Sequence, residues 1–241
     1  MLNMFKFRSL GPAAYSGRIS DLAVNLACTV EQAATCPAWR RWGRRTSHQM
    51  AENQPWQLSN EALETPRASL GCFIREQEYL GLGHSVFGGV ADALEEVLTE
   101  GYREAVLCWG IGSGKSFAAS LSVSYMLHSL LCMRSPQAAL GLAEDTNVTV
   151  ITMAPSSRQA RQIVFGTVSR LIQGSPWFQD HAPDAQHLAN EIRFPKNLVL
   201  VAGNSSTTFP LGYNVLGAVI DEAAFFPWSG GGRAESVEDI Y

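Results

Sequence analysis

The stretch Cys108–Ser120, "CWGIGSGKSFAAS", determines how the rest of the sequence is interpreted. The segment "YREAVLCW" leads into it and predicts a strand, while the apolar run Phe117–Met133 predicts a buried helix after it. Between them, glycines alternate in "GIGSGKS", residues 110–116. A glycine turn between a strand and a helix can point several backbone N–H groups at one anion, because glycine has no Cβ and accepts positive φ.

The turn departs from the usual phosphate-binding signature at one position. That signature has a glycine five residues before the glycine of Gly-Lys-Ser, and Trp109 stands there in this chain. The surrounding strand and helix still favour a phosphate-binding loop, in which Lys115 would reach the outer phosphates of ATP and Ser116 would bind Mg²⁺. The alternative is a glycine-rich turn with a chance lysine. The residues expected to bind the nucleotide are Gly110, Ile111, Gly112, Ser113, Gly114, Lys115 and Ser116.

A second motif, "GAVIDE" at residues 217–222, has the pattern of an apolar strand that ends in two carboxylates, often called Walker B. A strand end in an open α/β sheet lies at the crevice where such folds bind ligands. Asp221 would join Ser116 in holding Mg²⁺, and Glu222 would orient and deprotonate the attacking water. Lys115 and Glu222 are therefore the predicted catalytic residues. The alternative is an acidic helix cap after a buried strand.

The elements expected around these motifs alternate between strand and helix, which predicts a doubly wound α/β fold with a mostly parallel sheet and helices on both faces. The expected helices cover residues 90–100 and 117–133 and a segment that begins at Ser156 or Ser157. The expected strands lie within residues 102–109, 148–155, 190–194, 197–203 and 214–226. Residues 136–146 and 174–185 are expected to be loops.

Composition limits the function classes. The chain of 241 residues is 46% hydrophobic and 17% charged, which favours a well-buried core. Its formal net charge of −4 means that the chain as a whole does not attract nucleic acid, although a local basic patch is still compatible with the sequence. The five cysteines include no C-x-x-C pair, so reduced thiols are expected rather than zinc or disulfides. No secretory signal or membrane span is expected.

The domain prediction divides the chain at residue 75. Residues 1–75 are expected to be partly disordered or a small subdomain, and residues 76–241 a P-loop ATPase domain. The N-terminal segment contains "WRRWGRR", Trp39–Arg45, which suits contacts with nucleic acid. The alternative for these residues is a solvated basic turn or a disordered arm.

From about Tyr79 to Trp228 the chain resembles the ATPase part of the large terminase subunit, the DNA-packaging motor of tailed bacteriophages. "GIGSGKS", "VTVITMAPSSRQARQIVF" and the block "EIRFPKNLVLVAGNSSTTFPLGYNVLGAVIDEAAFF" carry the resemblance. It implies a RecA-like core that uses ATP and Mg²⁺ to move double-stranded DNA into a procapsid in the host cytoplasm. It also implies a homo-oligomeric ring with a portal protein and a small terminase subunit as partners, and no membrane.

Two departures from the family pattern matter. Many terminases have a basic residue in the loop where this chain has Ile111; Arg158 and Arg161 are possible substitutes, although arginines on such a helix are usually surface residues. The sequence ends at Tyr241, soon after Glu222, so a fragment, split gene or truncated reading frame without nuclease activity is expected. A helicase-like P-loop translocase and a non-hydrolysing nucleotide-binding or assembly module are the alternative functions.

Overall fold

The computed structural model describes residues 20–25, 62–83, 85–99, 104–109, 112–203 and 212–223. The described strands form a seven-stranded sheet in the order β2-β1-β7-β3-β6-β5-β4. They are β1 (Ser20–Asn25), β2 (Glu104–Trp109), β3 (Val148–Met153), β4 (Gln186–His187), β5 (Glu191–Phe194), β6 (Leu198–Gly203) and β7 (Val215–Asp221). The predicted strands are thus found close to their expected positions.

The sheet is mixed, with most strands pointing the same way. β3 pairs in parallel with β6 and with β7, and β1 pairs antiparallel with both β2 and β7. β5 pairs antiparallel with β4 and β6, so β1 and β5 alone among the described strands oppose the common direction. The predicted α/β class with a mostly parallel sheet is confirmed.

Strand β1 was not predicted. It is the second strand from one edge of the sheet, where Leu22 pairs with Leu107 of β2 on one side and with Asp221 of β7 on the other. Residues 20–25 of the N-terminal segment therefore belong to the same sheet as β2, the strand that precedes the glycine loop. β1 lies between β2 and β7, the two strands that carry the motifs. The basic segment Trp39–Arg45 lies outside the described residues.

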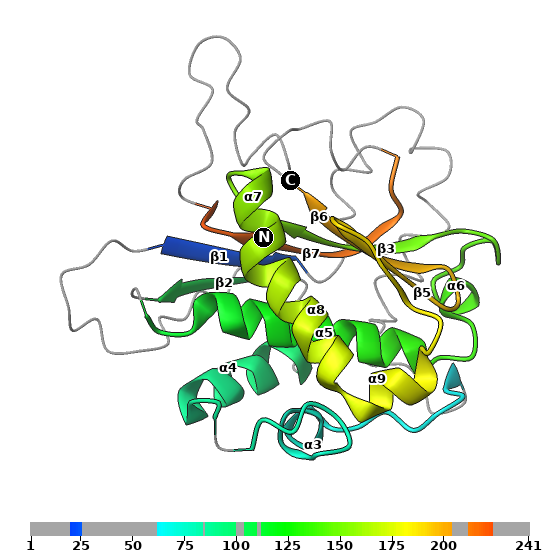
Figure 1. Ribbon diagram of the computed structural model, residues 1–241, viewed down its shortest axis with the longest axis horizontal. Coiled ribbons are helices and arrows are strands. Elements are labelled where there is room, and N and C mark those ends of the chain that lie inside the picture. The colour runs from blue at the N-terminus through cyan, green and yellow to red at the C-terminus, as the bar shows by residue number, and fades with distance from the viewer. Residues whose placement is uncertain are drawn as a thin grey trace, which may run out of the picture.

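Helix α5 (Lys115–Leu131) is the centre of the core, and Figure 1 shows it below the sheet with other helices gathered around it. From Ala118 to Leu131 every residue of α5 is buried, as the sequence predicted. Its buried serines are tolerated because their hydroxyls bond carbonyls one turn back, as Ser122 does to Ala118 and Ser124 to Ser120. The other helices are α3 (Leu70–Arg75), α4 (Gly88–Thr99), α6 (Pro136–Ala139), α7 (Ser157–Ala160), α8 (Gly166–Gly174) and α9 (Pro176–His181).

The sheet has two differently covered faces. All six residues of β3 are buried, and alternation sends Val150 into the main core beneath the sheet and Ile151 into a small cluster with Met153 and Ile220 on the opposite face. The described helices α4, α5, α8 and α9 lie on the side of the main core (Figure 1). Helices over the opposite face stay a prediction.

Two predicted loops contain short helices. Residues 174–185 include α9, where Ser175 accepts a hydrogen bond from the Phe178 N–H at the cap and Pro176 occupies the first turn. Residues 136–146 include α6, which Ser135 caps. Both corrections have the same cause: a serine followed by proline is a helix-start signal, and the helices are too short for an apolar period to show.

The helix after β3 contains a π-turn. α7, a π-helical segment η2 (Arg161–Phe165) and α8 follow one another without a break and run across α5 (Figure 1). The Ser156 hydroxyl accepts the Gln159 N–H at its start, which agrees with the predicted cap. None of the helices among the described residues has the length and apolarity needed to cross a membrane.

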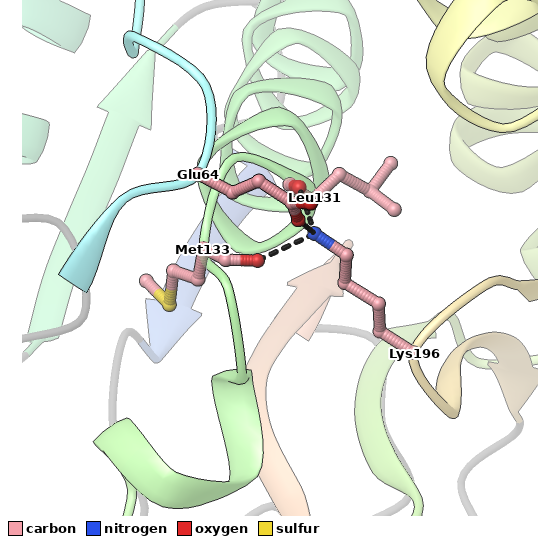
Figure 2. A network of polar contacts seen from close by, with 4 residues as sticks. All are labelled: Glu64, Leu131, Met133 and Lys196. Atoms are coloured by element: carbon pink, nitrogen blue, oxygen red, sulfur yellow. Dashed lines mark hydrogen bonds and ion pairs between the residues drawn. The ribbon is translucent and has the colours of Figure 1, made fainter.

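The far end of α5 is held by a lysine from the β5–β6 turn. Lys196 and Asn197, the central residues of this turn, have positive φ values of 61° and 53°. The Lys196 ammonium donates to the carbonyls of Leu131 (2.9 Å) and Met133, and pairs with Glu64 Oε2 at 2.7 Å (Figure 2). Because Glu64 belongs to the strand-like segment before α3, this contact ties three parts of the chain together.

Candidate functional site: a glycine loop and two carboxylates

The glycine loop joins the end of β2 to the start of α5. Gly112 and Gly114 have φ values of 77° and 88°, a region that other residues rarely adopt, so their type is required by the backbone. Gly114 is the N-cap of α5, and a Cβ there would stand 3.6 Å from Val90 of α4. Gly110 and Ile111 lie outside the described residues. The first N–H groups and the dipole of α5 make its start favourable for an anion.

Lys115 is the first residue of α5 and is only 7% exposed. Its ammonium donates a 2.9 Å hydrogen bond to the carbonyl of Trp109, at the root of the loop. A buried ammonium needs strong acceptors. The backbone carbonyl of Trp109 therefore holds the Lys115 side chain beside the loop, although tryptophan stands where the usual signature has glycine.

Ser116 and Asp221 meet although 105 residues separate them in the sequence. The Ser116 hydroxyl donates to Asp221 Oδ2 at 2.9 Å, and Asp221 is 1% exposed. Burial raises the pKa of Asp221, and this effect is opposed by the hydrogen bonds from Ser116 and the Glu222 N–H and by the charge of Lys115. The structure thus brings Ser116, Asp221 and Glu222 together at one edge of the sheet, and the charge of Lys115 acts on Asp221 as well.

Glu222 follows Asp221 in an unusual backbone conformation. Its φ is 59°, and its N–H donates to Asp221 Oδ1 at 3.1 Å. A glutamate in the left-handed region is uncommon and costs of the order of 1 kcal/mol. The strand ends at Asp221, which is buried, whereas Glu222 in the turn that follows is partly exposed.

The two arginines considered as substitutes for a basic loop residue are both exposed. Arg158 donates to Gln162 Oε1 at 3.2 Å on its own helix. The helix that carries them begins after β3, which is parallel to β7, so it starts at the same edge of the sheet as Asp221. The structure supplies no contact that draws Arg158 to Lys115 or Asp221.

The donor set fits a metal–nucleotide pair. A serine hydroxyl and a carboxylate, already 2.9 Å apart, are the oxygen ligands that Mg²⁺ accepts beside phosphate and water. Beside them stand a buried ammonium and the start of a 17-residue helix. Trp109 Nε1 at the loop root is a buried donor without a hydrogen-bond partner in the described part of the chain. The cation and the helix N-terminus both favour a polyanion.

Sequence reasoning missed part of the surroundings of this site. The hydrogen bond from Lys115 to the Trp109 carbonyl could not be predicted, because every residue has a backbone carbonyl whatever its type. Strand β1 between the two motif strands was also missed, since the six residues of "SDLAVN" include Ser20, Asp21 and Asn25 and only a short apolar run. The helical packing of Val90 against Gly114 agrees with the predicted helix, whose register places Val90 inward.

A strand, a glycine loop with a lysine and a serine, a buried helix, and a carboxylate at the end of another strand of the same sheet define a P-loop domain, the class of nucleotide-binding folds. Residues 78–241 match the family model "Uncharacterized protein MJ0330, N-terminal P-loop domain", and the chain belongs to this family. A search of curated proteins and a search of solved structures gave no match.

Proposed function

We propose that the chain is a Mg²⁺-dependent ATPase and that it serves as the motor module of a terminase-like machine that moves double-stranded DNA. The observation that carries hydrolysis is the convergence of Ser116 with Asp221 and the carboxylate of Glu222 directly after it. The resemblance of the block from Glu191 to Phe226 to large terminase subunits supports the DNA-packaging role, and with it a ring of subunits, a portal protein and a small terminase subunit as partners.

Each residue has a distinct task in this proposal. Lys115, which donates to the Trp109 carbonyl in the structure, would pair with the terminal phosphates, and Ser116 and Asp221 would hold Mg²⁺, which would neutralise phosphate charge. Glu222 accepts a proton from the attacking water. Asp221, which is buried, would hold the metal, and Glu222, which is partly exposed, would be accessible to the attacking water.

Measurements of nucleotide binding and of ATP turnover distinguish the roles of these residues. Lys115→Ala should lose binding of a fluorescent ATP analogue, whereas Glu222→Gln should bind it and lose phosphate release. Unchanged affinity in a folded Lys115→Ala variant would contradict the loop assignment. Normal turnover in Glu222→Gln would move the proton acceptor elsewhere, and tight binding without any turnover in the unaltered chain would leave a nucleotide-binding module rather than an ATPase.

The DNA-moving role has its own test. Turnover should rise when linear duplex DNA is added and should rise with protein concentration, because a ring can supply an arginine from the neighbouring subunit, worth about 10³–10⁵ in rate. Turnover that is fast, independent of concentration and indifferent to DNA would contradict the motor proposal while leaving the ATPase intact.

A further inference from the structure

The helix formed by α7, η2 and α8 buries residues at an interval of four rather than 3.6. The buried positions of this row are Ala160, Val164, Val168 and Ile172, each at most 2% exposed. In an uninterrupted α-helix each step of four would turn the row by about 40°, so its ends would face different directions. The π-turn at Arg161–Phe165 widens the helix locally and keeps the row against α5.

The same turn aligns a second row on the opposite, outer side. Its members are Arg158, Gln162, Gly166 and Arg170, also four apart; the three with side chains are exposed. The alignment agrees with the hydrogen bond from Arg158 to Gln162 and with the place of Arg170 Nη1, which would lie 3.8 Å from a Cβ at Gly166. Gly166 is required there, since that Cβ would also come within 2.9 Å of the Arg161 carbonyl.

The outer row is basic in a chain that is otherwise acidic. After residue 75 the sequence has nine basic and 17 acidic residues, yet no acidic residue occurs between Asp145 and Asp180, where Arg158, Arg161 and Arg170 lie. Arg158 donates to Gln162 and Arg170 to the Thr167 hydroxyl, both neutral acceptors, and within the described part of the chain neither guanidinium pairs with a carboxylate.

We propose that the row from Arg158 to Arg170 contacts the phosphate backbone of double-stranded DNA. The two arginines are separated by 12 residues, about 18 Å along a helix, and Gly166 leaves a gap through which a phosphate strand can approach. The row has donors but no apolar anchor, which suits a polyanion better than a protein surface. This inference rests on the proposed DNA-moving function and assigns it a surface.

The affinity of the full chain for labelled linear duplex DNA tests the surface, measured by fluorescence anisotropy between roughly 50 and 200 mM salt. Replacing Arg158 and Arg170 together by glutamine should weaken binding about tenfold or more and reduce the slope of log K against log salt by about 2, since each lost phosphate contact removes about 0.9. The loss should be equal for AT-rich and GC-rich duplexes, because phosphates carry no sequence.

Arg193→Gln is the matched control, because Arg193 is exposed but already paired with Glu191 at 2.6 Å; its slope should not change. Lys115→Ala should keep DNA binding, which separates failure of the nucleotide site from failure of this surface. An unchanged slope in the double arginine variant would overturn the inference alone. Absence of DNA binding by the unaltered chain at the lowest salt would overturn both the inference and the DNA part of the proposed function.

Discussion

Replacing Lys196 by methionine should destabilise the fold although this residue lies in a surface turn. Methionine keeps the aliphatic stem and removes the ammonium that bonds the carbonyls of Leu131 and Met133, residues that are 4% and 0% exposed. A hydrogen bond from a charged donor contributes about 1.5–3 kcal/mol. Since the lysine side chain is 26% exposed, water can partly replace it, and we expect a loss near the lower figure, about 2 kcal/mol in total.

Urea unfolding followed by circular dichroism measures this loss, and a thermal scan should show a decrease of about 4–8 °C in Tm. Glu64→Gln is the control: the carboxylate is 57% exposed, so its pair with Lys196 should contribute little and its variant should unfold almost like the unaltered chain. Equal losses in the two variants would show that the ion pair, not the helix end, carries the stability. A loss below about 0.5 kcal/mol for Lys196→Met would refute the reasoning.

The remaining predictions concern buried charge and strain. Asp221→Asn should abolish Mg²⁺-dependent nucleotide binding but raise stability by about 1 kcal/mol near neutral pH. Burial raises the pKa of Asp221, and in the variant the amide oxygen can accept the Glu222 N–H while the amide nitrogen donates to the Ser116 hydroxyl; calorimetry without nucleotide checks this. Glu222→Gly should lose turnover and gain a similar amount, since glycine accepts the φ of 59°; a loss of stability would contradict the strain. Burial lowers the pKa of His128 to about 3, so stability should fall as pH decreases from about 6.5 toward 3, because the unfolded chain takes up a proton that the folded chain refuses; His128→Phe should flatten this dependence in acid titrations of the unfolding free energy.

Much of the fold could be predicted because it depends on local patterns. The six buried residues of β3 form one apolar run in the sequence, and α5 is a long apolar segment that follows a glycine turn. The position of Asp221 beside Ser116 could also be predicted, since the carboxyl ends of parallel strands meet at one edge of the sheet. What was predictable is therefore either local or fixed by sheet topology.

The parts that could not be predicted depend on contacts between distant residues. Lys196 and Glu64 are 132 positions apart, and nothing in the residues around either one indicates the other. In principle the π-helical turn could have been predicted, because the spacing of four between buried residues is larger than the period of an α-helix. Its prediction, however, requires knowing which apolar residues face the core. β1 has no such signal at all.

The two ends of α5 differ in a way that bears on function. At its C-terminus Lys196 satisfies the last carbonyls, as a cation should at the negative end of a helix dipole. At its N-terminus the contacts of Lys115 and Ser116 are with a neutral carbonyl and with a carboxylate that burial makes costly to charge. In the proposed function a phosphate with its cation would replace these N-terminal contacts. The proposal thus assigns the N-terminal end of α5 to the ligand, while Lys196 holds the C-terminal end.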